Sequence, residues 1–91
     1  MKNNEIENFI ANNQQWLYKN DMLIGKFSFK SFAELQSTIL TTMNIADELK
    51  HHPTVIFAYD TLEIQLQTHD AGNKVTELDL TFAQRVSDRI G

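Results

Sequence analysis

The sequence predicts an α+β domain in which three helices cover one face of a four-stranded antiparallel sheet, in the order α-β-β-α-β-β-α. Two observations carry this prediction. Apolar residues recur at helical spacing in three segments, and two pairs of short β-forming segments lie between those helices. A short polar turn joins each pair, so neither pair needs the long crossover that parallel strands require. Antiparallel pairs that alternate with helices favour a sheet with its helices gathered on one face.

The length and composition are those of one small globular domain. The chain has 91 residues, of which 42% are apolar and 22% are charged. We therefore expect a single domain over residues 1–91 with one core. A domain of this size buries only roughly 60 to 70% of the surface that its unfolded chain exposes. Association with further copies of the chain is therefore expected to add to its stability.

Charge and cysteine content exclude several kinds of site and partner. The chain has no cysteine, which rules out a disulfide framework and a thiolate zinc site. Lys and Arg number 8 against 12 Asp and Glu, and the net charge of −4 attracts neither nucleic acid nor an anionic membrane. No apolar run is long enough for a signal peptide or a membrane span. We therefore expect a cytoplasmic protein that binds neither nucleic acid nor membrane.

The first elements follow from local patterns near the N-terminus. Apolar residues at positions 6, 9 and 10 predict a first helix that ends in a polar run. Aromatic and aliphatic residues over 16–18 and 22–29 then predict a hairpin, because they suit a half-buried sheet and a polar turn separates them.

A longer central helix follows the first hairpin. Ser31 and Glu34 have the spacing of a capping box, in which both side chains satisfy backbone N–H groups of the first turn. The apolar positions of this helix recur at helical spacing, and they are Phe32, Leu35, Ile39, Met43, Ala46 and Leu49. Pro53 disfavours helical geometry at the residue before it, so the helix should end just before His51 or His52.

A second hairpin and a last helix complete the predicted fold. Residues 55–59 and 62–68 form the strands, and alternation puts His69 on the polar face where the second strand ends. Thr76 is positioned to cap the last helix. The apolar stripe of that helix consists of Phe82, Ala83, Val86 and Ile90. Asp79 lies on the same stripe in the first turn, so its carboxylate should face inward.

All three histidines lie between positions 51 and 69, and each has an ordinary structural interpretation. His51 and His52 fit a helix stop, because a histidine near a helix C-terminus favours the negative end of the dipole. His69 fits a solvated turn residue. A functional interpretation is favoured by Asp47, which stands four residues before His51 and should orient that ring and favour its protonated form. A proton donor near neutral pH would result.

The spacing of these residues matches a known pattern. Along the chain it reads Asp47-x3-His51-His52-Pro53-x5-Tyr59-x9-His69-x9-Asp79. This closely resembles the pterin-4a-carbinolamine dehydratase family, whose hallmark is an acidic residue followed by His-His-Pro and later by Thr-His. The resemblance spans roughly residues 16 to 90. It implies the fold predicted above, homodimers that often pair into homotetramers, and a pocket lined by the three histidines.

The resemblance also implies an activity. Members of this family dehydrate 4a-hydroxytetrahydropterin to quinonoid dihydropterin and water, which recycles tetrahydrobiopterin after an aromatic amino acid hydroxylase has used it. One group protonates the departing hydroxyl and another removes a proton from the ring nitrogen, so neither a metal nor a cofactor is expected. His51 and His69 would be the acid and the base, in an order that the sequence leaves open, and His52 would mainly bind the pterin.

The resemblance adds four supporting residues to the three histidines. Asp47 and Asp79 would support the histidines, and Thr68 and Asp70 would offer backbone hydrogen bonds to the planar heterocycle. The sequence departs from the usual pattern at residues 54–55, where Thr-Val stands in place of an acidic residue and an aromatic one. This departure touches the rim of the expected pocket and leaves the three histidines intact.

Three alternatives stay open at this point. A non-catalytic member of the same fold could act in oligomeric assembly or dimerisation, as relatives in transcriptional coactivation and rubisco assembly do, but such members often lose the histidines. A metal site is disfavoured, because the chain lacks the His-x3-His spacing that places two ligands on one helix face. A plain binding module with a helical face for partners is also compatible with the sequence.

Overall fold

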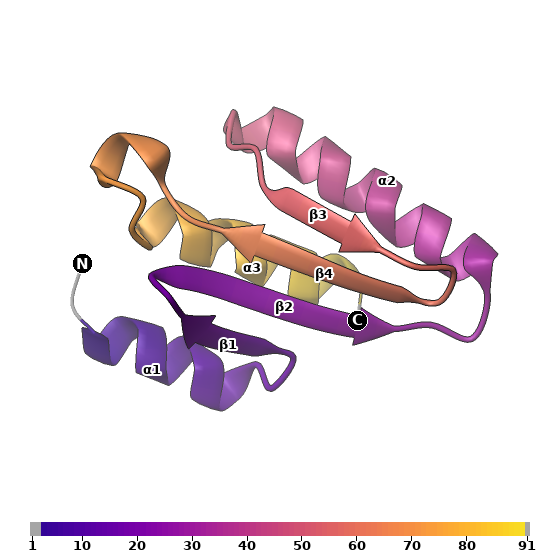
Figure 1. The fold of residues 1–91 in the computed structure, drawn as a ribbon, viewed down its shortest axis with the longest axis horizontal. Coiled ribbons are helices and arrows are strands. Elements are labelled where there is room, and N and C mark those ends of the chain that lie inside the picture. Colours follow the sequence, from indigo (N-terminus) through magenta and orange to yellow (C-terminus); the bar gives the residue numbers. More distant parts are fainter. Residues whose placement is uncertain (1–2, 91) are drawn as a thin grey trace.

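Figure 1 shows the computed structural model, which describes residues 3–90. Its elements are α1 (Asn3–Asn12), β1 (Trp16–Lys19), β2 (Met22–Ser28), α2 (Phe32–Leu49), β3 (Thr54–Phe57), β4 (Thr61–Leu66), the 3₁₀ turn η1 (His69–Ala71) and α3 (Glu77–Ile90). The strands pair antiparallel in one four-stranded sheet of order β1-β2-β4-β3. The predicted α+β class and the order α-β-β-α-β-β-α are therefore confirmed.

The hydrophobic core lies between the sheet and the helices. On β4, Leu62, Ile64 and Leu66 alternate with polar residues and are at most 1% exposed. Figure 1 shows α3 passing behind β2 and β4, with α2 beside β3 and α1 beside β1. The helix residues buried in this core are Ile6, Leu35, Ile45, Ala46, Phe82, Ala83 and Val86. Burial of this apolar surface is the main force that holds the helices on the sheet.

Trp16 fixes the first hairpin against α3. Its indole is 1% exposed, and its Nε1–H donates to Ser87 Oγ at 3.1 Å. Gly25 is its partner across the strands, and a Cβ there would come within 2.8 Å of the indole ring. Glycine is therefore required at this position by the close approach of the tryptophan ring.

The buried face of α2 differs from the predicted stripe. Leu35 and Ala46 are buried as predicted, but Met43 is 61% exposed, and Thr38 and Thr42 are buried instead. The Thr42 hydroxyl donates to the Thr38 carbonyl at 2.9 Å, so it keeps a hydrogen-bond partner inside the protein. The predicted stripe counted only apolar residues, and it therefore missed threonines that enter the core with their hydroxyls satisfied.

Glu48 ties the last turn of α2 to α3. Its carboxylate accepts from Arg85 Nη1 at 3.1 Å and from the two Nη atoms of Arg89 at 3.0 and 2.8 Å. The hydrogen bond from Arg89 lowers the pKa of Glu48, and the same bond raises the pKa of Arg89. These side chains are 40 to 42% exposed, so solvent screens the cluster, which orients the end of α2 more than it stabilises the fold.

The second hairpin is shorter than predicted at its C-terminal end. β4 ends at Leu66 rather than at position 68, and His69 opens the turn η1. His69 is exposed, which confirms its predicted position away from the apolar face, although the strand period does not continue to that residue. The loop after β4 sets its position instead. No helix among residues 3–90 has the length and apolar character needed to cross a membrane.

Candidate functional site

The turn after α2 sends His51 and His52 in different directions. α2 ends at Leu49, and Lys50 adopts a left-handed conformation with φ of 51°. The N–H groups of Lys50 and His51 both donate to the Ala46 carbonyl, which is a common way to end a helix. The predicted helix end is therefore confirmed. His51 turns inward and is 9% exposed, whereas His52 lies at the surface.

A compact loop after β4 presents His69. Thr68 bridges to Lys74 across this loop, and its N–H donates to the Lys74 carbonyl at 2.7 Å. Gly72 and Asn73 then reverse the chain in left-handed conformations, with φ of 78° and 60°. The exposed ring of His69 is held by Asn73, since Nδ1 of the ring lies 2.7 Å from Asn73 Oδ1.

The first turn of α3 places Asp79 in the core. Thr76 Oγ1 accepts the N–H of Leu78 at 3.3 Å, and Asp79 Oδ2 accepts the N–H of Thr76 at 2.9 Å. This reciprocal arrangement is a capping box, so the predicted cap at Thr76 is confirmed. Asp79 is 0% exposed, which confirms that its carboxylate faces inward.

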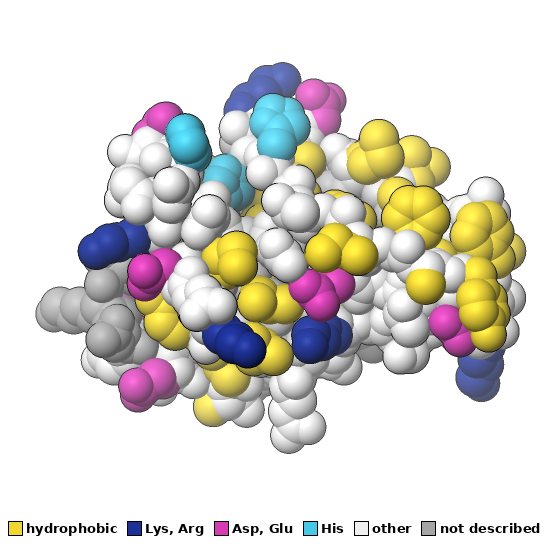
Figure 2. Space-filling model, viewed as in Figure 1, with side chains coloured by type: hydrophobic (Ala, Val, Ile, Leu, Met, Phe, Trp, Pro, Cys, Tyr) yellow, Lys and Arg dark blue, Asp and Glu magenta, His cyan; other side chains and the backbone are white. Residues whose placement is uncertain are grey.

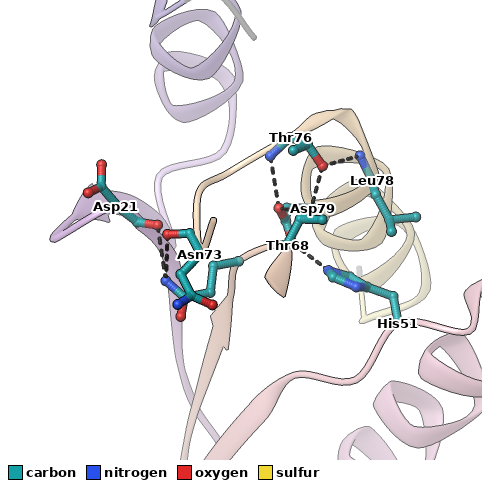
Figure 3. A network of polar contacts seen from close by, with 8 residues as sticks. Asp21, His51, Thr68, Asn73, Thr76, Leu78 and Asp79 are labelled. Atoms are coloured by element: carbon teal, nitrogen blue, oxygen red, sulfur yellow. Dashed lines mark hydrogen bonds and ion pairs between the residues drawn. The ribbon is translucent and has the colours of Figure 1, made fainter. Parts of the chain in front are cut away.

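The Asp79 carboxylate joins α3 to both histidine-bearing loops, as Figure 3 shows. Its Oδ1 lies 2.5 Å from His51 Nε2, and its Oδ2 accepts from Thr68 Oγ1 at 2.8 Å. A carboxylate can only accept, so His51 Nε2 carries a proton and Nδ1 is the nitrogen left for other partners. The His51 ring also packs edge-on against Phe82, with ring centroids 6.2 Å apart. The orientation of His51 is therefore fixed from two sides.

One pocket of about 290 Å³ brings the three histidines together. It is lined by Lys50, His51, His52, Gln67, Thr68, His69, Asp70 and Leu78. Figure 2 shows the histidines gathered around a hollow at one end of the visible face. The volume is close to the lower end for small-molecule sites, which suits a compact heterocycle. Within residues 3–90, no cluster of three or more His, Asp or Glu side chains is arranged to hold a metal ion.

Asp47 does not pair with His51, and the predicted i,i+4 contact is wrong. Its carboxylate points to solvent, with the side chain 86% exposed, and lies 3.5 Å from Lys50 Nζ. The i,i+4 geometry requires a helix that continues to His51, but α2 ends two residues earlier and Lys50 turns left-handed. Asp79 contacts His51 instead.

Residues 1–89 match the family model described as pterin 4 alpha carbinolamine dehydratase. The chain belongs to this family.

Several relatives support this membership in the pterin-4a-carbinolamine dehydratase family. The chain is 34% identical over 84 residues to a provisionally named pterin-4-alpha-carbinolamine dehydratase of Sulfolobus acidocaldarius, covering 92% of this chain and 91% of the relative. It is 35% identical over 81 residues to a protein of the same provisional name from Opitutus terrae, covering 89% and 84% of the two chains. The match therefore extends over nearly the whole of both proteins.

Two solved structures share the fold. A transcriptional coactivator/pterin dehydratase from Brucella melitensis superposes with a TM-score of 0.89 at 26% identity, covering 100% of this chain and 98% of that one. A pterin dehydratase-like protein identified as a RuBisCO assembly factor in the alpha-carboxysome gives a TM-score of 0.69 at 25% identity, covering 84% and 87%. The dehydratase fold therefore also occurs in a protein described as an assembly factor.

The pocket contains residues that the sequence did not single out. Lys50, Gln67 and Leu78 line it beside the predicted residues. Gln67 could have been predicted from the sequence, because it directly precedes Thr68 at the end of the predicted strand. Asn73 does not line the pocket but contacts His69, and no spacing rule connects a loop asparagine to a histidine four residues earlier.

Proposed function

We propose that the chain dehydrates 4a-hydroxytetrahydropterin to quinonoid dihydropterin and water by histidine acid–base catalysis. The observation that carries this proposal is the convergence of His51, His52 and His69 on one pocket, in a member of the pterin-4a-carbinolamine dehydratase family. The three rings come from two loops that are separated by a complete hairpin. A general acid and a general base can therefore reach one ligand from two sides.

The reaction needs two proton transfers. One group protonates the C4a hydroxyl as the C–O bond breaks, and water leaves. The other group removes the proton from the neighbouring ring nitrogen, and the electron pair of that N–H bond forms the new C=N bond. We assign these transfers to His51 and His69, and binding of the pterin to His52 at the pocket surface. No metal or cofactor takes part in this scheme.

Four further residues would support the reaction from different positions. Asp79 would hold the His51 ring through Nε2. Thr68 and Asp70 would offer backbone groups to the heterocycle, since both line the pocket. Asp47 would act at most from the His52 side, where the two residues share a neighbouring groove of about 250 Å³.

We further propose that copies of the chain assemble into a homodimer or homotetramer. β3 is the outer strand of the sheet and pairs only with β4, so its other edge is available for another copy. Large apolar side chains are exposed beside that edge and on the outer side of α2, namely Leu40, Met43, Ile56, Phe57 and Tyr59. A second copy of the same chain would cover them, because symmetric pairing is the common way to bury such a surface.

The physiological setting follows from the proposed reaction. An aromatic amino acid hydroxylase would supply the 4a-hydroxy pterin, and the product would return to the reduced cofactor pool. The absence of cysteine and the net charge of −4 fit a cytoplasmic enzyme with no nucleic acid or membrane partner.

A second candidate function is assembly or dimerisation without catalysis. It is favoured by the structural match to the RuBisCO assembly factor and by the exposed apolar surface of α2 and β3. The complete set of three histidines favours the enzyme, because a purely structural role would not need three imidazoles around one pocket.

Variants at the histidines test the proposed reaction. His69→Ala should reduce kcat by about a hundredfold or more, which is the usual contribution of one acid–base group. His51→Gln should have a similar effect, and it is preferable to alanine because its amide can still donate to the buried Asp79 carboxylate. His52→Ala should mainly raise KM.

The matched control is Asn8→Ala, an exposed change in α1 outside the pocket. Circular dichroism and urea unfolding would verify that each variant is folded. Full activity in both His69→Ala and His51→Gln would rule out the proposed catalysts.

A further inference from the structure

Two hydrogen bonds hold the backbone of Asn73 in place. Its N–H donates to the Thr68 carbonyl at 3.1 Å, and its carbonyl accepts from Gln67 Nε2 at 3.2 Å. Gln67 Nε2 also lies 3.4 Å from the carbonyl oxygen of Asp21, which links the loop to the β1–β2 turn. Figure 3 shows Asn73 beside Asp21, on the opposite side of the Thr68 segment from His51. The side-chain amide of Asn73 therefore projects toward His69 from an anchored backbone.

The contact between Asn73 and His69 determines which ring nitrogen carries the proton. Asn73 Oδ1 lies 2.7 Å from His69 Nδ1, and an amide oxygen can only accept. In a neutral imidazole one nitrogen is a donor and the other an acceptor. Nδ1 is thus the protonated nitrogen of neutral His69, and Nε2 carries the free electron pair. Since this ring lines the pocket, Nε2 is the nitrogen left for a ligand.

We infer that Asn73 is a positioning residue that fixes the tautomer of His69 and makes Nε2 of that ring the proton acceptor of the pocket. This inference rests on the proposed function, and it resolves the order of acid and base within it. His69 would take the proton from the pterin ring nitrogen. His51 would deliver a proton to the departing hydroxyl from Nδ1 of its imidazolium form, in which Nε2–H stays bound to Asp79 and the Asp79 carboxylate is the counter-charge.

The direct test is nitrogen NMR of the protein with labelled imidazole rings. At about pH 8.5, roughly two units above the ordinary histidine pKa, neutral tautomers are observed. The signals of His69 can be assigned by their loss in His69→Gln, because the chain has only 3 histidines. The expected spectrum has a protonated Nδ1 and a bare Nε2 on His69.

Two variants of Asn73 separate its side chain from its backbone. Asn73→Gly removes the amide but keeps the left-handed conformation that glycine adopts freely. This variant should give a mixture of His69 tautomers. It should lower kcat about threefold to tenfold, which corresponds to the net contribution of one hydrogen bond, with little change in KM. Asn73→Asp keeps an acceptor and should preserve the Nδ1–H tautomer. The control is Asn20→Gly, the same change at another left-handed turn residue.

Two results would overturn the inference. A bare Nδ1 on His69 would mean that the amide donates instead of accepting, and an unchanged tautomer in Asn73→Gly would mean that Asn73 does not control the ring. Both results are independent of turnover. The tautomer of His69 could change in Asn73→Gly while the native protein fails to dehydrate the pterin. In that case the proposed function would be wrong, but the control of the His69 tautomer by Asn73 would still hold.

Discussion

Among the single side chains of the site, that of Asp79 has the most hydrogen-bond partners. Its carboxylate accepts from a ring nitrogen of His51, the hydroxyl of Thr68 and the N–H of Thr76, and it is 0% exposed. Because a buried charge is tolerated only with such partners, the three donors and the carboxylate depend on one another. A change at this one side chain therefore affects both histidine-bearing loops and the start of α3.

Asp79→Asn is expected to destabilise the fold by about 3 kcal/mol, because it removes the charge from a buried hydrogen-bonded pair and turns one acceptor into a donor. Turnover should fall with it, since His51 loses its fixed orientation. Urea unfolding would measure the loss. Asp88→Asn is the matched control on the exposed side of α3 and should change stability by less than about 0.5 kcal/mol. Equal effects of the two variants would contradict the role given to Asp79.

The sequence predicted which residues lie at the pocket better than it predicted their contacts. The helical period placed Asp79 inward, and the structure confirms this. The same period paired Asp47 with His51, and this failed because the helix ends before the histidine. Local spacing cannot predict a contact such as His51–Asp79, which joins residues 28 positions apart. Local spacing also cannot predict the contact of Asn73 with His69, because the orientation of Asn73 depends on the conformation of a loop.

At the scale of elements, the approach of β1 to β2 depends on Gly25. The indole of Trp16 would come within 2.8 Å of a Cβ at residue 25, and it donates a hydrogen bond to Ser87 of α3. The hairpin and the last helix are therefore coupled through one aromatic ring. Such coupling is a packing property that strand patterns do not reveal.

Gly25→Ala is expected to cost about 1 to 3 kcal/mol, because the added methyl group overpacks a core that cannot yield. Gly72→Ala serves as the comparison. It has no neighbour within 4 Å of a new Cβ, and its left-handed backbone alone should cost about 1 kcal/mol. Thermal or urea unfolding would rank the two. A Gly25→Ala effect no larger than that of Gly72→Ala would show that Trp16 can move aside.

The elements themselves were largely predictable, and their inward faces less so. Capping signals at Ser31 and Thr76 correctly located two helix starts, because cap chemistry is local. The burial of Thr38 and Thr42 in place of Met43 was not predictable from polarity. Which residues of α2 are buried depends on the rotation of the helix about its axis where it packs against β4 and α3, and this rotation is set by tertiary packing.

At the scale of the whole molecule, the exposed apolar surface of α2 and β3 is the main feature that one copy of the chain leaves uncovered. Leu40 and Met43 are 59% and 61% exposed on α2, and Ile56 and Phe57 are 53% and 57% exposed on β3. The fold class and strand pairing came from patterns within one chain. Assembly depends on surfaces that local patterns assign to the core, as happened with Met43.

Sedimentation equilibrium should give a mass that is a multiple of the 10.5 kDa chain. Leu40→Lys combined with Met43→Lys should shift the protein toward the monomer, because charges cannot be buried unpaired in such an interface. Asn44→Lys is the control on the same helix, where the native side chain is polar and exposed. A monomeric native protein at micromolar concentration would contradict the proposed assembly.

The three-histidine pocket is the proposed site at which a 4a-hydroxy pterin is dehydrated. The most direct measurement is the first-order decay of freshly generated 4a-hydroxytetrahydropterin, followed by ultraviolet absorbance with and without the purified native protein. We predict that catalytic amounts of the protein accelerate the decay by about a hundredfold or more and that His69→Ala abolishes most of this acceleration. Decay at the uncatalysed rate, with a folded and correctly assembled protein, would rule out the proposed dehydratase activity and favour the assembly function.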